Sequence, residues 1–418
     1  MKNFFLLIAA AAALLACRRT EADIPSPPPG AGPVEISPPG LARMFSELPL
    51  QSGNLHEVYD AVCHSSGRGY DEEYTMAELV SPSGGTKAGA SYGTPLRELI
   101  RQYCEERMSA MTRSGGGAQA VLEALAASGY QLYWPYSDGW DGKTFPIITF
   151  DPGDGAETNY GYEISLSEDG TRIVDSVYVD ESVALRRPVW VVNANSDSGF
   201  EPLESSLSGD SESFSLLVRS GAGKASAPEP KSAAGPVIEG MTAAAARAGT
   251  ERAASPAPSG SRTRKLMLKS FKMLRNYDSW FGGASEFLVK CGSVNGFNAS
   301  TDAELKLYTP TVTDFMIVVK RRLVGKDVPY DAILVSDFTS QLEKLAFVVV
   351  EDDGGTTTSW RCEAVVKISS KSYGFTLDIP YRDRDDIVWR GQLPTSFFFE
   401  EDVVESRFGD VVISFELI

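Results

Sequence analysis

The segments "RCEAVVKI" at residues 361–368 and "YGFTLDI" at residues 373–379 alternate apolar and polar side chains along their whole length. In the first segment Cys362, Ala364 and Val366 share one face, while Arg361 and Glu363 share the other. Successive side chains of a β-strand point to opposite faces of the sheet. The alternation therefore predicts two strands, each with one buried face.

Similar apolar runs lie on both sides of this pair, and no helical pattern competes with them. They are "EFLVKC" (286–291), "DFMIVVKR" (314–321), "DAILVSD" (331–337), "LAFVVVEDD" (345–353) and "DVVISFEL" (410–417). About seven or eight strands at this spacing are typical of a β-sandwich. Residues 263–418 are therefore predicted to form an all-β sandwich domain.

Residues 41–200 show a different order, with helical segments first and strands after them. Helices are predicted in "DEEYTMAELV" (71–80), where Asp71 would be the N-cap, in "TPLRELIRQYCEERM" (94–108) and in "AQAVLEALAASG" (118–129). Strands are predicted in "QLYW" (131–134), "FPIITF" (145–150), "YGYEIS" (160–165), "TRIVDSVYV" (171–179) and "PVWVVN" (188–193), with a turn at Asp169-Gly170. This part is predicted to be an α+β domain with an antiparallel-type sheet.

The N-terminus, "MKNFFLLIAAAAALLAC", carries one basic residue and then a short apolar run. That run is shorter than the roughly 20 residues that span a bilayer, so residues 1–16 are predicted to be a signal peptide. The end of the run, Leu14 to Cys17, resembles the lipobox of bacterial lipoproteins. The resemblance implies that Cys17 carries the lipid. Arg18, in place of the aspartate that retains many lipoproteins at an inner membrane, favours the outer membrane and leaves the exposed face open.

Two further segments are poor in core-forming residues. Residues 17–40 are rich in proline and are predicted to form an extended tether between the lipid and the folded chain. Residues 201–262 are rich in Ser, Ala, Gly and Pro and are predicted to be a flexible linker. The two domains are therefore expected to fold independently.

The chain has 39 basic and 56 acidic residues and a formal net charge of −17. A nucleic-acid-binding face needs a basic stripe, so no nucleic-acid partner is expected. With only two histidines, a histidine-rich metal site is excluded, and no cofactor is expected. After Cys17, one cysteine pair remains in each half. A disulfide between Cys291 and Cys362 and a pair of core thiols both remain open.

The stretch "YWPYSDGWDGKTFPIITFDPGDG" (133–155) interleaves aromatic and acidic side chains. Aromatic rings can stack on sugars, and carboxylates can accept hydrogen bonds from their hydroxyl groups. The candidate ligand-binding residues are Tyr136, Asp138, Trp140, Asp141, Asp151 and Asp154. The alternative is structural, because two Asp-Gly pairs predict a hairpin-like connection whose aromatic side chains pack on the sheet or the helices.

Four short segments resemble known catalytic or metal-binding motifs. "GASYG" (89–93) matches a nucleophile elbow but follows loop sequence, and "HEVYD" (56–60) lacks the second histidine of a zinc motif. "DPGDGAETN" (151–159) resembles a calcium loop in composition alone. The acidic segments near Asp352 and Asp383 resemble the calcium loops of C2 domains, but Arg382 and Arg384 interleave with the acids.

The segments "YWPYSDGWDGKTFPIITF", "RRPVWVVN" and "DSWFGGASEFLVKCGS" resemble recurrent segments of lipoproteins from gut Bacteroidota. The resemblance implies origin and architecture, and it assigns no activity. We therefore expect an outer-membrane lipoprotein with a binding or envelope-structural role and no chemistry of its own. Its partners would be the membrane, through Cys17, and a glycan or another envelope protein.

Two alternatives remain open. One is glycan binding by the aromatic and acidic loop. The other is a hydrolase that uses paired carboxylates. A deep pocket holding two close acids would favour the hydrolase, and a flat aromatic shelf would favour glycan binding.

Overall fold

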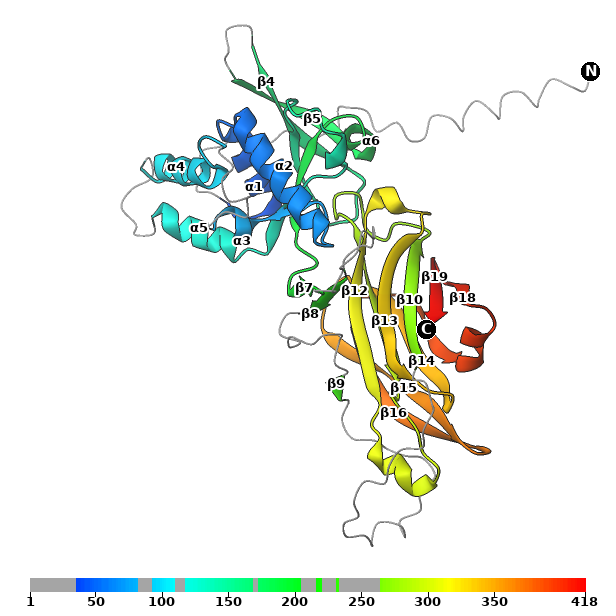
Figure 1. Ribbon diagram of the computed structural model, residues 1–418. Helices are drawn as coiled ribbons and strands as arrows, with labels where there is room; N and C mark the ends of the chain where they lie inside the picture. The colour runs from blue at the N-terminus through cyan, green and yellow to red at the C-terminus, as the bar shows by residue number, and fades with distance from the viewer. Residues whose placement is uncertain are drawn as a thin grey trace, which may run out of the picture.

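The computed structural model describes residues 35–81, 92–109, 117–167, 172–203, 216–219, 231–232 and 264–418. The predictions for the signal peptide, Cys17, most of the tether, the Asp169-Gly170 turn and most of residues 201–262 lie outside this range. The described chain is mostly β, with few helices and extensive antiparallel sheets. In Figure 1 the helices gather beside the N-terminal sheet, and strands β10–β19 form an elongated second part.

Five helices accompany the N-terminal sheet: α1 (Pro38–Glu47), α2 (Ser52–Gly67), α3 (Met76–Leu79), α4 (Leu96–Ser109) and α5 (Ala118–Ala126). The first begins at Ser37, whose side chain accepts a hydrogen bond from the Gly40 amide, with Pro38 at the first helical position. The last is followed by Gly129 with φ 69°, a left-handed conformation that favours glycine. The predicted helices at 94–108 and 118–129 are present within these bounds.

The N-terminal sheet has six strands in the order β1-β2-β6-β3-β4-β5. They are β1 (Glu73–Thr75), β2 (Tyr130–Tyr133), β3 (Ile147–Phe150), β4 (Thr158–Leu166), β5 (Arg172–Asp180) and β6 (Val189–Ala194). The sheet is not purely antiparallel as predicted, because β3 and β6 run parallel with Ile148 opposite Trp190. The chain returns to β6 only after β4, β5 and the short helix α6 (Glu181–Ala184), and this long return permits the parallel pair.

Both faces of β6 are buried, which explains its nearly continuous apolar run. Trp190 and Val192 belong to the core under helices α1–α5, while Val189 and Val191 belong to a separate cluster on the opposite face. That cluster also includes Trp280 and Phe281 from the C-terminal part. We call it the junction cluster.

The segment "DEEYTMAELV" is not one helix capped by Asp71, as the sequence predicts. Glu73–Thr75 forms β1, and the helix begins only at Met76, with Thr75 as its N-cap. The Asp71 carboxylate accepts a hydrogen bond from the Ala284 amide at 2.9 Å. Tertiary contacts thus override the local helix signal and bury the three acidic residues 71–73.

The C-terminal part has ten described strands in residues 264–418: β10 (Arg264–Met273), β11 (Ser285–Ser293), β12 (Thr311–Val319), β13 (Val328–Phe338), β14 (Leu342–Glu351), β15 (Thr357–Ile368), β16 (Lys371–Arg382), β17 (Asp386–Pro394), β18 (Val403–Phe408) and β19 (Val411–Leu417). One sheet has the order β13-β10-β19-β18, and the other includes β16-β15-β14-β11-β12. Both sheets contribute to one core, so the arrangement is sandwich-like.

The predicted linker at 201–262 is partly ordered. Three short strands, β7 (Phe200–Pro202), β8 (Leu217–Arg219) and β9 (Lys231–Ser232), extend the larger sheet beyond β12. Leu217 lies opposite Met316 of β12 and is fully buried. Strands of two or three residues carry too little alternation to be recognised in a sequence rich in small residues, so the sequence did not predict them.

Hydrogen bonds also join the two parts. Asn193 donates from Nδ2 to the carbonyl groups of Phe281 and Gly282 at 3.0 and 2.7 Å. The Trp280 indole donates to the Glu157 carbonyl at 2.9 Å. The connection between β10 and β11 therefore docks against the N-terminal sheet through both apolar and polar contacts.

Candidate functional site

The aromatic side chains of the 133–155 stretch mostly pack inward. Tyr133 and Trp134 are only 2% and 1% exposed. Trp140 is half-buried, and its ring lies 5.1 Å from the Trp134 ring and 5.0 Å from the His56 ring, centroid to centroid. Its indole donates to the Thr144 carbonyl at 2.9 Å. These contacts give Trp140 a packing role in a cluster of rings.

Tyr136 is half-buried and sits at the edge of the junction cluster. Its backbone has φ 58°, and its hydroxyl donates to Glu181 at 2.7 Å. Glu181 also pairs with Arg321 of the C-terminal part at 2.8 Å. Tyr136 thus belongs to a network that joins the two parts.

The four candidate aspartates have local partners. Asp141 accepts hydrogen bonds from the Thr144 and Lys143 amides. These bonds, and most of all the one from Thr144, lower the pKa of Asp141 to about 2. Asp151 and Asp154 each accept from an amide two residues further on, in the turn between β3 and β4. The exposed Asp138 pairs with Arg322 at 3.3 Å. Three of the four therefore stabilise the turns in which they lie.

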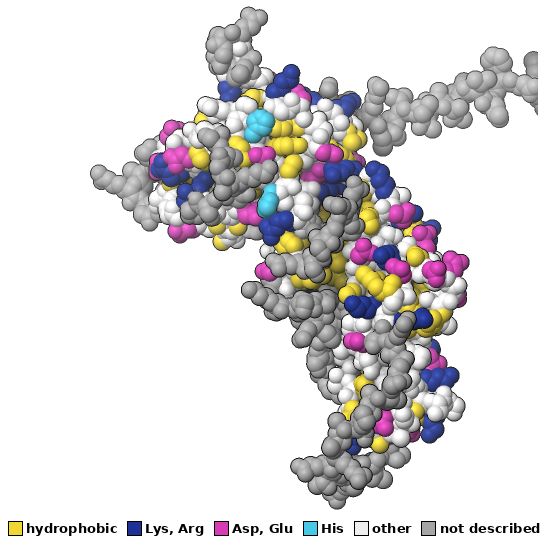
Figure 2. Space-filling model, in the orientation of Figure 1, with side chains coloured by type: hydrophobic (Ala, Val, Ile, Leu, Met, Phe, Trp, Pro, Cys, Tyr) yellow, Lys and Arg dark blue, Asp and Glu magenta, His cyan; other side chains and the backbone are white. Residues whose placement is uncertain are grey.

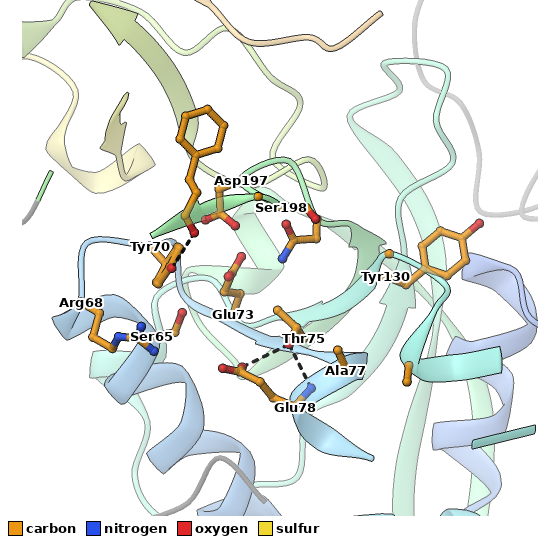
Figure 3. Close-up of a pocket in the computed structure, with 15 residues that line it drawn as sticks. Ser65, Arg68, Tyr70, Glu73, Thr75, Ala77, Glu78, Tyr130, Asp197 and Ser198 are labelled. Atoms are coloured by element: carbon orange, nitrogen blue, oxygen red, sulfur yellow. Dashed lines mark hydrogen bonds between the residues drawn. The ribbon is translucent and has the colours of Figure 1, made fainter. Parts of the chain in front are cut away.

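A pocket of about 330 Å³ lies elsewhere in the N-terminal part. It is bounded by the end of α2, by β1 and α3, by the start of β2 and by residues 195–200. Figure 3 shows the side chains of Glu73 and Asp197 in its centre. None of the six candidate residues of the 133–155 stretch lines it.

Glu73 and Asp197 are 4% and 3% exposed. Burial first, and then the charge of Asp197, raise the pKa of the Glu73 carboxyl well above its usual range. Burial, followed by the charge of Asp71, raises the pKa of Asp197 to about 7. Oδ2 of Asp197 has no hydrogen-bond partner. The pocket thus holds two buried acids, and neither forms a salt bridge with a basic side chain of the described residues.

Aromatic and small polar groups surround this acid pair. The Tyr70 hydroxyl donates to the Phe200 carbonyl at 2.9 Å, and the Arg68 guanidinium lies 5.3 Å from the centre of the Tyr70 ring. Thr75 donates to Glu78 at 3.2 Å on the rim. Tyr130 and Ser65 also line the pocket. A ligand would find acceptors in its centre and rings at its edge.

No sequence pattern predicted this pocket. Its residues come from three segments more than 45 positions apart, near 65–78, 126–130 and 195–200. The one available signal was the acidic run Asp71-Glu72-Glu73, which the helix prediction placed at the N-terminus of a helix. A prediction that these acids are buried would have required knowing that β1 pairs with β2.

Within the residues that the structure describes, the other candidate motifs bring no further metal-binding group together. His56 and His64 are exposed on α2, and both histidines appear on the face shown in Figure 2. Residues 89–91 of "GASYG" lie outside the described range. Near the strand ends, Arg382 pairs with Asp352 at 3.0 Å, and Asp383 accepts from the Thr356 amide at 2.8 Å. This arginine therefore partly neutralises the loops that resemble those of C2 domains.

The cysteines of the described chain are all free thiols. Cys291 is fully buried in β11, and Cys362 is 9% exposed in β15. Burial raises the pKa of both thiols to about 12. The disulfide that the sequence left open is not formed in this structure.

Comparison of the chain with protein-family models, with curated proteins and with solved structures finds no match. In the part of the chain that the structure describes, no helix combines the length and apolarity that crossing a membrane requires.

Proposed function

We propose that this protein is an outer-membrane lipoprotein with a binding role, anchored through Cys17. The leader sequence and its lipobox-like end support the anchor. The described chain would present an α+β unit followed by a β-sandwich unit. The proline-rich segment 17–40 would separate both from the membrane surface.

We place the ligand in the pocket that holds Glu73 and Asp197. Buried carboxylates without a positive partner are costly, so a ligand that supplies positively charged N–H donors is favoured there. Hydroxyl groups on the same ligand would meet the polar lining, and an apolar ring face would meet Tyr130. The ligand class that fits is a small polyhydroxylated molecule with an ammonium group, and an amino sugar is the simplest example.

Calorimetric titration of the full chain with D-glucosamine and with N-acetyl-D-glucosamine tests this proposal. The two sugars differ in the ammonium group, so glucosamine should bind at least tenfold more tightly. Asp197→Asn should weaken glucosamine binding at least tenfold, because it removes a carboxyl group that would ionise beside the bound ammonium group. Asp175→Asn, an exposed acid on β5, serves as the matched control and should change nothing.

Two results would contradict the pocket assignment. Equal affinity for both sugars would show that no charge is recognised. Loss of binding in Asp154→Asn with retention in Asp197→Asn would move the ligand to the turn after β3, as the sequence alone suggested.

The carboxylate pair also supports a second candidate, a glycoside hydrolase. The high pKa of Glu73 suits a general acid, and a pKa of Asp197 near 7 suits a base that activates water. In that case a chromogenic glycoside of an amino sugar should be cleaved. Glu73→Gln should then abolish turnover and keep binding. Binding without turnover by the unmodified protein would leave the first candidate.

A further inference from the structure

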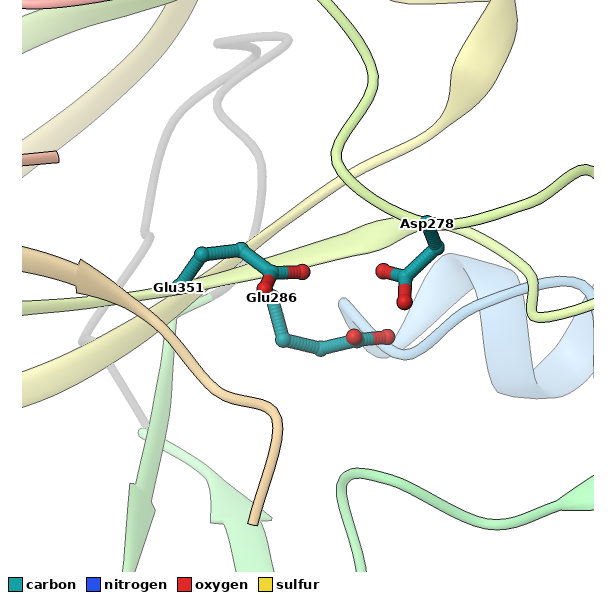
Figure 4. A group of neighbouring side chains, drawn as sticks. All are labelled: Asp278, Glu286 and Glu351. Carbon is teal, nitrogen blue, oxygen red and sulfur yellow. The ribbon is translucent and has the colours of Figure 1, made fainter. Parts of the chain in front are cut away.

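Three acidic side chains of the C-terminal part converge beside the junction cluster. Asp278, Glu286 and Glu351 each place a carboxylate oxygen within 4.8 Å of the others. Figure 4 shows the three groups pointing toward a common centre. None of them was singled out from the sequence, because they lie 8 and 65 positions apart along the chain.

The backbone holds two of these residues firmly. Glu286 is the second residue of β11, and Glu351 is the last residue of β14. The two strands are neighbours, with Phe287 opposite Glu351, and the Asp352 amide donates to the Glu286 carbonyl at 2.9 Å. Asp278 reaches the same place from the connection between β10 and β11. Three segments therefore supply one set of oxygen atoms.

These carboxylates lack ordinary partners. Glu351 is 1% exposed, and its carboxylate oxygens and Oδ2 of Asp278 accept no hydrogen bond from a donor other than a carboxyl group among the described residues; the neighbours of Glu351 are the carboxyl groups of Asp278 and Asp353. Glu286 is 3% exposed. An unpaired buried carboxylate costs several kcal/mol, so three together need a shared positive charge or shared protons.

Two basic side chains, Lys290 in β11 and Arg321 just after β12, are engaged elsewhere. Arg321 donates to Glu181 at 2.8 Å and to the main-chain carbonyl of Asp278 at 2.9 Å. Lys290 pairs with Asp314 at 3.1 Å. Neither forms an ion pair with the three converging carboxylates among the described contacts.

We propose that Asp278, Glu286 and Glu351 bind one Ca²⁺ ion. Hard oxygen ligands select Ca²⁺, Mg²⁺ or Mn²⁺ over softer metals. A Ca²⁺ ion with ligands at about 2.3–2.6 Å places opposite oxygens roughly 5 Å apart, which matches the spread of these atoms. Mg²⁺ usually keeps several waters, which a buried site disfavours. The three charges exceed those of the ion by one, so the site keeps a negative balance.

The position of the site gives the ion a structural role. Asp278 begins the segment that continues through Trp280 and Phe281 into the junction cluster. The same segment ends at Ala284, whose amide donates to Asp71 of the N-terminal part. An ion that ties Asp278 to β11 and β14 would therefore fix the segment that docks the two parts together.

The test uses the full chain, freed of metal with EDTA and titrated with CaCl2 or MgCl2 in a calorimeter. We expect one Ca²⁺ per chain, at least tenfold tighter binding than for Mg²⁺, and a higher Tm in Ca²⁺ than in EDTA. Tb³⁺, which replaces Ca²⁺ at oxygen sites, should luminesce on excitation of tryptophan, because Trp280 lies two residues after Asp278.

Glu351→Gln is the decisive variant, since it keeps the shape and removes one charge. It should bind Ca²⁺ at least tenfold more weakly and lose the Tb³⁺ signal. In EDTA its Tm should equal or exceed that of the unmodified chain, because charge repulsion is reduced. The exposed Glu401→Gln serves as the matched control and should retain both properties.

Two results would overturn the proposal. An unmodified chain with no binding heat and the same Tm in Ca²⁺ and EDTA would mean that the carboxylates share protons instead. Unchanged Ca²⁺ affinity in Glu351→Gln would place the ion elsewhere. Failure of glucosamine binding with intact Ca²⁺ binding would contradict the proposed function alone.

Discussion

At the scale of single residues, the acids near the junction of the two parts are unusual because burial has removed their water. Asp197 is 3% exposed and has one oxygen without a partner. Glu73 lines the same pocket and is similarly buried. Such side chains lower the free energy of unfolding unless protons or a ligand offset their charge.

The raised pKa of Asp197 predicts how stability depends on pH. The folded state keeps the proton up to about pH 7, while the unfolded chain loses it near pH 4. The folded state therefore binds more protons between these values, and the free energy of unfolding should fall as pH rises from about 4 to 7. For this group alone the fall should be up to about 4 kcal/mol.

Urea unfolding of the unmodified chain and of Asp197→Asn at several pH values measures this dependence. The variant cannot titrate at residue 197, so its stability should fall less steeply, and it should be the more stable protein at pH 8. Asp175→Asn removes an exposed carboxylate of β5 and should keep the slope of the unmodified chain. Parallel curves for Asp197→Asn and the unmodified chain would show that Asp197 is not protonated in the folded state.

At the scale of elements, the connection between β10 and β11 joins the two parts through apolar and polar contacts. Trp280 is 1% exposed in the junction cluster, and its ring lies 3.9 Å from the Phe281 ring, centroid to centroid. Its indole bond to the Glu157 carbonyl links it to the turn before β4. Trp280 belongs to the junction cluster and to neither of the two main cores, so its replacement probes the docking of the two parts.

We expect Trp280→Ala to lower the free energy of unfolding by about 3–5 kcal/mol, as loss of a buried tryptophan typically does. Trp360→Ala, at a half-buried position in β15, should lower the free energy of unfolding by less. Denaturant unfolding followed by far-UV circular dichroism compares the two. An effect of Trp280→Ala no larger than that of Trp360→Ala would show that the docking contributes little to stability.

The sequence predicted elements best where one face alone is buried. The β15–β16 pair keeps the expected alternation, with Cys362 opposite Leu377 and Ala364 opposite Phe375. Where both faces are buried, as in β6, the run identifies a strand but not its partner. The parallel pairing with β3 was therefore missed. At residues 71–75, the helix signal of the acids was outweighed by the pairing of Glu73 with Tyr133.

At the scale of the whole molecule, the pocket and the three converging carboxylates each bring together segments that lie far apart in the sequence. Glu73 and Asp197 meet only because β1, β2 and β6 are neighbours, and no local pattern encodes that order. The aromatic stretch at 133–155 was prominent in the sequence because bulky residues cluster there. Most of them pack against α2 and the sheet, and Trp140 does so with only part of its ring exposed.

The proposed anchor sets the location of the whole molecule and has its own test. Cys17→Ala should prevent acylation, because no thiol remains for the lipid. The variant should then leave the membrane fraction during ultracentrifugation. Metabolic labelling with a clickable fatty acid should mark the unmodified chain alone. Label or membrane association that persists in the variant would contradict lipidation at Cys17.

The central claim is that Glu73 and Asp197 together receive a ligand's ammonium group, and the number of protons exchanged on binding tests it most directly. At pH 6 the raised pKa keeps Asp197 mostly protonated, and a bound cation would favour its ionised form. Calorimetric titration with glucosamine in two buffers of different ionisation enthalpy should show the release of roughly one proton per ligand. Asp197→Asn should release fewer. Binding with no proton release in the unmodified protein would contradict the claim.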